Sequence, residues 1–220
     1  CACVRAEDKA ERARIKGLVH AYERRLAVCA KTDDSKEGTK VFGEMREEGV
    51  PITKNTWNMM LRLARGGEQT LSVFEQMRDA GVAATESSYS QVVRACALDG
   101  DVASASRLVR QCVSEGLVVR LRTFQPILVH YFSAGDLEKG FEWWDEMLAT
   151  DPTVLLSALN SHQGPVEEIF VHVIKGCAPR VLDGDEWACR KLDDLMGEMA
   201  EACLGVTEES AAVLCEAYGP

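Results

Sequence analysis

The sequence predicts an all-α fold, a right-handed α-solenoid built from stacked helical hairpins. The first observation is an internal repeat, because the stretches 86–120 and 121–150 carry equivalent residues such as Tyr89 and Phe124, 35 positions apart. The second is the spacing of apolar residues at i, i+4 and i+7 within each stretch, which is typical of one face of a helix. No segment shows the alternating pattern of a strand. Hairpins of this length bury one face only against their neighbours, and such stacks wind into solenoids.

Two residue series fix the register of the repeats. An aromatic residue marks each first helix: Tyr22, Trp57, Tyr89 and Phe124. A sulfur-containing residue marks each second helix: Met45, Met77, Cys112 and Met147. Each of the first three sulfur-containing residues lies 12 positions before the next aromatic residue. The interval from Trp57 to Met77 is three residues shorter than its equivalents, which predicts a shortened turn at Arg65-Gly66-Gly67.

The helix ends follow from short local signals. Asp34 or Ser35 is suited to begin the second helix of the first repeat, because short polar side chains accept hydrogen bonds from the first free amides. Each of the first three repeats then closes on glycine and a hydrophobic residue, as in Gly49-Val50, which suits a left-handed C-terminal cap.

These boundaries divide the chain into three parts. Residues 1–17 are charge-dense and are predicted to form an N-terminal helical lead-in. Residues 18–150 contain four repeats, at about 18–53, 54–85, 86–120 and 121–150. Residues 151–220 are predicted to form a degenerate fifth hairpin and a C-terminal capping helix. In this last part we expect a short helical piece at 154–159, helices at 166–174, 186–203 and 208–217, and a loop at 177–184.

Composition limits the classes of function. The net charge is −10, and residues 166–220 contribute −8 of it, from four basic and twelve acidic residues. An acidic average argues against sequence-independent coating of nucleic acid but allows a local basic groove. No apolar run approaches the roughly 18 residues of a membrane span, so we expect no membrane partner. The chain begins at Cys1 rather than methionine, which suggests a fragment or a processed form.

The nine cysteines are scattered and form no CxxC pair. This pattern favours a reducing compartment with free, buried thiols. A zinc site from His172, Cys177 and Cys189 is an open alternative, although the spacing matches no regular zinc finger.

The repeats resemble pentatricopeptide repeats. The resemblance rests on the aromatic residue near the start of each first helix, on the phrases VFGEM, VFEQM and WWDEM, and on the endings GVPIT, GVAAT and GLVVR. The Trp–Leu-Gly–Tyr pattern of tetratricopeptide repeats is absent. The resemblance implies that two residues of each repeat face one RNA base: the residue after the aromatic and the last residue of the repeat. By position these base-recognition residues are Glu23 with Thr53, Asn58 with Thr85, and Ser90 with Arg120, while Gln125 takes the first place in the fourth repeat.

The chemistry of these residues suits base recognition, because Asn, Ser and Gln side chains hydrogen-bond to Watson–Crick edges. Glu23 and Arg120 depart from the family's usual combinations, which argues against a simple base-by-base code. Further arginines on or near first helices are candidates for phosphate contacts or stacking: Arg62, Arg65, Arg94, Arg120 and Arg122.

The chain is most similar to the N-terminal repeat domain of protein-only RNase P, and the most specific match is Leu-Arg-Thr-Phe-Gln-Pro at 121–126. This resemblance implies a domain that grips the elbow of precursor tRNA during 5′ leader processing. It also implies that the nuclease domain and its metal ions lie outside this chain, so we expect no catalytic residue, metal or cofactor here. Whether the chain is part of an enzyme stays open. The resemblance points to the mitochondrion or plastid, with the nucleus as a further option.

Two alternatives belong to other classes. One is a structural repeat protein within an organellar ribonucleoprotein such as a ribosome, with the acidic C-terminal part facing other proteins. The other is a peptide-binding solenoid.

Overall fold

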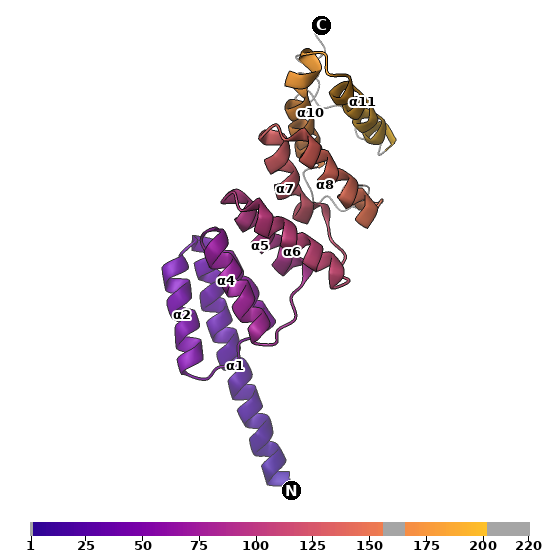
Figure 1. Ribbon diagram of the computed structural model, residues 1–220. Helices are drawn as coiled ribbons and strands as arrows, with labels where there is room; N and C mark the ends of the chain where they lie inside the picture. Colours follow the sequence, from indigo (N-terminus) through magenta and orange to yellow (C-terminus); the bar gives the residue numbers. More distant parts are fainter. Residues whose placement is uncertain (1, 156–165, 202–220) are drawn as a thin grey trace. The chain divides into compact units, whose positions relative to one another are not determined.

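The computed structural model describes residues 2–155 and 166–201, and within these ranges every regular element is an α-helix (Figure 1). The chain divides into two compact units, Cys1–Asp99 and Gly100–Pro220. We call them the N-terminal and C-terminal units and describe each by itself. No helix in the described ranges has the length and apolar character needed to cross a membrane.

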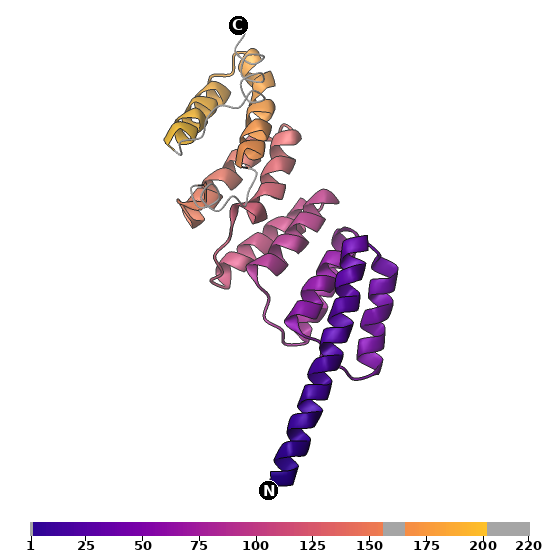
Figure 2. The same cartoon turned by 180° about the vertical axis from the view of Figure 1, so that it is seen from behind.

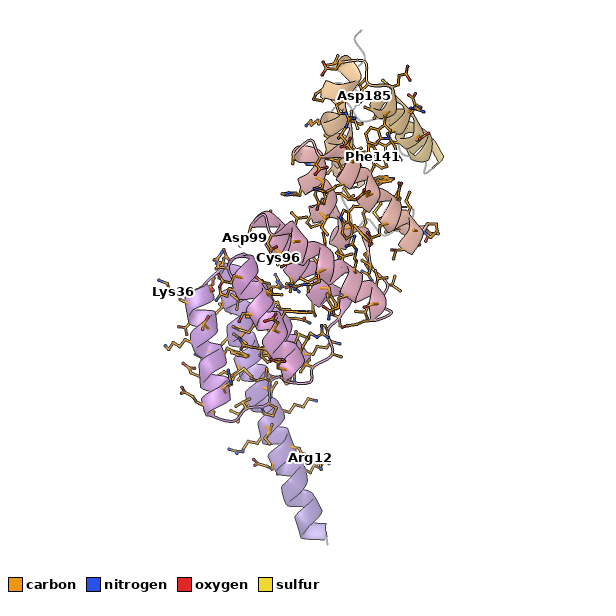
Figure 3. All side chains as sticks on the ribbon, viewed as in Figure 1. Arg12, Lys36, Cys96, Asp99, Phe141 and Asp185 are labelled. Atoms are coloured by element: carbon orange, nitrogen blue, oxygen red, sulfur yellow. The ribbon has the colours of Figure 1, made fainter. Side chains whose placement is uncertain are left out.

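The N-terminal unit contains the first five helices. They are α1 (Ala2–Thr32), α2 (Ser35–Glu47), α3 (Lys54–Leu63), α4 (Gly66–Asp79) and α5 (Glu86–Leu98). Helices α1 and α2 form one hairpin and α3 and α4 the next, while α3 packs beside both α1 and α5. The predicted lead-in is not a separate element, because α1 runs without a break from Ala2. Both views show its N-terminal half extending past the other helices of the unit (Figure 2), and Arg12 marks this part in Figure 3.

The two predicted residue series form the core of this unit. Met45 and Met77 are fully buried, and aromatic residues of successive hairpins meet edge to face. The ring centroids of Phe42 and Trp57 are 5.2 Å apart, and those of Phe74 and Tyr89 are 4.9 Å apart. Each such pair joins the second helix of one hairpin to the first helix of the next.

The predicted helix ends are confirmed. Asp34 begins α2 by accepting a hydrogen bond from the Glu37 amide at 3.0 Å. Gly49 has a φ of +65°, the left-handed conformation expected after α2. The shortened turn is also confirmed, since only Ala64 and Arg65 separate α3 from α4. The two glycines of that predicted turn are instead the first residues of α4.

The C-terminal unit contains the remaining helices of the described ranges. They are α6 (Val102–Ser114), α7 (Leu121–Ser133), α8 (Leu137–Thr150), α10 (Val166–Leu182) and α11 (Glu186–Glu201). Helices α7 and α8 form a hairpin, as do α10 and α11, and α7 packs beside both α6 and α10. The rings of Trp144 and Phe170 are 5.4 Å apart and repeat the edge-to-face contact of the N-terminal unit. Phe170 therefore takes the aromatic place in the fifth hairpin.

The loop predicted at 177–184 was wrong. Helix α10 continues through Pro179 to Leu182, and the turn comes only at Asp183 and Gly184. A proline removes one backbone hydrogen bond, but this part of the helix buries Cys177 and Val181, and packing outweighs that loss. The predicted piece at 154–159 is helical at its first two residues, Val154 and Leu155. Its remainder and the capping helix at 208–217 lie outside the described residues.

Candidate nucleic-acid interface

The first helices present equivalent residues at fixed distances from each predicted base-recognition residue. The positions are three before it, the residue itself, one after it and four after it, which fall on one helix face. We call this set in the N-terminal unit the first-helix stripe. Its members are His20, Glu23, Arg24 and Ala27 on α1, Asn55, Asn58, Met59 and Arg62 on α3, and Ser87, Ser90, Gln91 and Arg94 on α5.

A groove with a cavity volume of about 680 Å³ is lined by residues of α1 and α3, most of them members of the first-helix stripe. Its lining consists of His20, Glu23, Arg24, Ala27, Ala30, Lys31, Asn55, Met59 and Arg62. Arg24, Lys31 and Arg62 are exposed cations, and none has an ion-pair partner among the described residues. The groove therefore combines an apolar part with three unpaired positive charges and one carboxylate.

Glu23 is held in this groove by the start of α3. The Thr53 hydroxyl donates to Glu23 Oε1 at 2.5 Å, and the Thr56 hydroxyl donates to the same oxygen at 3.4 Å. Thr53 and Thr56 also form the capping box that begins α3. The other carboxylate oxygen, Oε2, lies 3.9 Å from His20 Nδ1. The predicted pair Glu23 and Thr53 is thus brought together, but as a contact between successive hairpins.

The same arrangement recurs between α3 and α5 with an amide in place of the carboxylate. The Ser88 hydroxyl donates to Asn58 Oδ1 at 3.0 Å, and Ser88 shares a capping box with Thr85. The structure therefore links the predicted pair Asn58 and Thr85 through Ser88. The Asn58 amide nitrogen has no partner in the described part of the chain, so its two N–H groups are available as donors.

The remaining predicted residues of this unit differ in their partners. Ser90 is half-buried, and Arg94 is exposed at the position equivalent to Arg62. Neither Ser90 nor Arg94 has a side-chain partner among the residues described. Arg65, in contrast, already has an ion-pair partner, because its guanidinium lies 2.7 Å from the Asp33 carboxylate.

In the C-terminal unit the predicted residues lie at the start of α7. Arg120 is exposed immediately before the helix, and Arg122 is half-buried in its first turn. Gln125 donates from Nε2 to Glu168 Oε2 of α10 at 3.1 Å. Ser90 and Arg120, predicted as a pair, belong to different units.

Sequence reasoning missed several lining residues of the groove: His20, Arg24, Lys31, Asn55 and Met59. The signal was present, because each lies one, three or eight residues from Glu23 or Asn58 in the same helix. Extending the helical register of Glu23 and Asn58 finds them.

No group of metal-ligand residues is assembled within residues 2–155 and 166–201. The alternative zinc residues, all of them within the described ranges, are not brought together, and His172 Nδ1 lies 3.1 Å from the Ser133 hydroxyl. Cys177 is fully buried, and this burial raises the pKa of its thiol to about 12. The loop carboxylate Asp185 has a structural partner, because it accepts from the Trp187 amide at the start of α11 at 2.9 Å.

Comparison with solved structures shows the fold. The chain aligns with nuclear proteinaceous RNase P 2 (PRORP2) from Arabidopsis thaliana at a TM-score of 0.72 and 19% identity, covering 91% of this chain and 42% of that chain. It aligns with the PPR domain of Arabidopsis thaliana protein-only RNase P 1 (PRORP1), solved in complex with tRNA, at a TM-score of 0.69 and 20% identity, covering 94% of this chain and 100% of that chain. A third match is the pentatricopeptide repeat protein PPR10 in complex with an 18-nt psaJ RNA element, at a TM-score of 0.54, 21% identity, 83% of this chain and 28% of that chain. The predicted all-α solenoid of pentatricopeptide type is confirmed.

Comparison with family models gives a match over residues 9–155 to the pentacotripeptide-repeat region of PRORP. No curated protein sequence matches significantly. The chain spans less than half of PRORP2 and the whole of the PRORP1 repeat domain. The matched residues include all four predicted repeats, and the chain therefore belongs to the family of PRORP pentacotripeptide-repeat regions.

Proposed function

We propose that this chain is an RNA-binding repeat domain that grips precursor tRNA and presents it for removal of the 5′ leader. Membership of the PRORP repeat family and the tRNA bound to the PRORP1 repeat domain support this proposal. The observation that carries it is the groove between α1 and α3, where three cations face solvent without partners in a chain of net charge −10.

Cations of this kind suit the RNA backbone. Phosphates attract unpaired Lys and Arg side chains, and the counterions they release make the affinity fall as salt increases. The overall negative charge opposes indiscriminate association with nucleic acid. A local basic groove on an acidic protein therefore favours RNA whose shape brings phosphates to that place.

The predicted residues divide into three roles under this proposal. Arg62, Arg94, Arg120 and Arg122 contact phosphates, and Asn58 and Ser90 contact base edges, whereas the Gln125 amide is bonded to Glu168. Thr53 and Thr85 act mainly as helix caps: Thr53 bonds to Glu23 directly, and Thr85 bonds to Ser88, which in turn holds Asn58. Recognition then depends on shape and on a few bases rather than on one base per repeat.

Cleavage belongs to a nuclease domain outside this chain, and the metal ions of the reaction belong there too. The domain itself binds RNA without cutting it. A mitochondrial or plastid site of action, or a nuclear one, remains part of the proposal.

Competition binding tests the proposal. In this assay, unlabelled mature tRNA or an unstructured RNA of equal length is added to the complex of the chain with labelled precursor tRNA. We expect mature tRNA to displace the labelled precursor and the unstructured RNA to displace it poorly. The double variant Arg62→Gln/Arg94→Gln weakens binding, whereas Arg46→Gln on the exposed face of α2 serves as the matched control. Equal competition by unstructured RNA contradicts the proposal. Stable co-purification with a large particle, without tRNA binding by the isolated chain, would instead favour the structural alternative.

A further inference from the structure

We infer that the N-terminal half of α1 is a further RNA-binding surface, which contacts the phosphates of a helical arm of the bound tRNA outside the groove. This inference rests on the proposed RNA-binding function and extends it to a segment that precedes the four repeats. Three observations carry it: this half has no packing role, its charges lie on separate faces, and its positive face continues into the groove.

The N-terminal half of α1 does not pack against the rest of its unit. Every residue from 9 to 17 is exposed except Ile15, which is half-buried, and the first buried residue described in this helix is Tyr22. A Cβ at Gly17 would meet nothing within 4 Å, so no other helix lies against that point. Figures 1 and 2 show this half extending past the other helices of the unit. Its side chains therefore face solvent and can meet a ligand.

The charges of this half lie on separate faces of the helix. Lys9, Arg12 and Lys16 follow one another at intervals of three and four residues, which places them on one face. All three are exposed, and none has an ion-pair partner among the described residues. Glu11 lies toward the opposite side, where Arg14 pairs with it at 2.9 Å. The three cations of the first face are therefore not neutralised by the helix itself.

This positive face continues into the groove. Two further steps of four residues lead from Lys16 to His20 and Arg24, and both of these line the groove. We call the face from Lys9 to Arg24 the basic face of α1. At a rise of 1.5 Å per residue it is about 22 Å long. An RNA whose phosphate meets Arg24 therefore has further cations along its path on the same helix.

The chemistry of the N-terminal half favours phosphates over bases. Lysine and arginine bind phosphate oxygens, whereas residues 9–17 include no aromatic ring for stacking and no amide side chain for a base edge. Cations repeated along a straight helix match the regular backbone of a helical RNA arm, which proteins recognise mainly by its shape and phosphates. A lipid surface is a poorer fit, because Ile15 is the only large apolar residue among residues 9–17.

The first experiment removes the cations of this half and measures how tRNA affinity depends on salt. The basic-face variant is Lys9→Gln/Arg12→Gln/Lys16→Gln, and it should keep the helix because glutamine has a helix propensity similar to that of lysine and arginine. The slope of log affinity against log salt should become shallower by about 2–3, since three phosphate contacts are lost. Affinity should fall about tenfold or more at roughly 0.1 M salt, and the difference from wild type should shrink as salt rises.

The matched control removes the same number of charges from another helix of the same unit. Lys36, Lys40 and Arg46 are exposed on α2 and do not line the groove. The variant Lys36→Gln/Lys40→Gln/Arg46→Gln has the same net charge as the basic-face variant. Its salt slope should differ from that of wild type by less than about one, because it loses no phosphate contact.

The second experiment changes the RNA. Two tRNAs are made, one with a shortened acceptor arm and one with a shortened anticodon arm, so that the elbow stays intact. We expect one of these truncations to weaken binding to the wild-type chain and to cause no further loss with the basic-face variant, because both changes remove the same contact.

Three results overturn the inference: the basic-face variant keeps the wild-type salt slope, the α2 control loses as much slope, or neither arm truncation weakens binding to the wild-type chain. Tight tRNA binding by the wild-type chain with any of these results leaves the proposed function intact. A wild-type chain that does not bind tRNA refutes both. Far-ultraviolet circular dichroism of each variant confirms that its helices are retained.

Discussion

Gly67 lies at the closest approach of α4 to α5, and replacing it with alanine should separate the two helices. A Cβ at this position would stand 2.8 Å from Cys96 Cα, 3.2 Å from Cys96 N and 3.3 Å from Ala95 O. All three atoms belong to the α5 backbone, so no side-chain rotation relieves the contact. The Gly67 amide also donates to Asp99 Oδ2 at 2.6 Å. Figure 3 labels Cys96 and Asp99 near this end of α4.

The size of the effect follows from these distances. Carbon atoms prefer a separation of about 3.5–4.0 Å, so the helices must move apart by roughly 0.7–1.2 Å. Overpacking of this kind typically costs about 1–3 kcal/mol. Alanine recovers up to about 1 kcal/mol of helix propensity relative to glycine. We therefore expect Gly67→Ala to lower the free energy of unfolding of the N-terminal unit by about 1–2 kcal/mol.

Urea denaturation followed by circular dichroism measures this change. The matched control is Gly43→Ala on α2, where a Cβ meets nothing within 4 Å. This control should gain up to about 1 kcal/mol from helix propensity alone. If Gly67→Ala unfolds at the same urea concentration as Gly43→Ala, or at a higher one, the close approach of α4 and α5 is not as described.

Three further predictions follow from single contacts. Burial raises the pKa of the Cys177 thiol from 9.0 to about 12, so the folded chain keeps a proton that the unfolded chain loses. The urea concentration at the unfolding midpoint should therefore decrease as the pH rises above 9.0, and Cys177→Ala should show a smaller decrease. Ser88→Ala should lower the free energy of unfolding by about 1 kcal/mol, because it removes half of the α5 capping box and the hydrogen bond to Asn58. Thermal unfolding measures this loss, which should be smaller for Ser88→Thr. Arg62→Gln and Arg94→Gln should each reduce the slope of log affinity against log salt by about 0.7–0.9 in tRNA titrations, while an unchanged slope would place both arginines away from the phosphates.

The order and type of the helices in the first four repeats could be predicted from the sequence, because they depend on local periodicity. The aromatic and sulfur-containing residues recur at nearly constant spacing, and each is buried where helical geometry requires it. Capping residues such as Asp34 act within one turn, so their role is visible in a short window of sequence.

The fifth hairpin could not be predicted as well, because packing there outweighs local signals. Pro179 and Gly184 suggested a loop, yet α10 persists through Pro179 to bury Cys177 and Val181. Phe170 takes the aromatic place after a longer connection than in earlier repeats, so a fixed spacing did not find it.

For the candidate site, the sequence identified residues but not their partners. Glu23 was placed correctly on a first helix, but its bonds to Thr53 and Thr56 depend on the packing of α1 against α3. The same holds for Asn58, whose orientation depends on Ser88 of the following repeat. Contacts between repeats are not encoded in the spacing within a repeat.

The bond from Ser88 to Asn58 limits how such repeats can be exchanged. Asn58 lies in the second repeat, but the hydroxyl that orients it belongs to the third. A graft of residues 54–85 alone into another solenoid would leave this asparagine free to rotate. A transferable segment therefore has to continue through the first turn of α5, so that Ser88 is transferred together with Asn58.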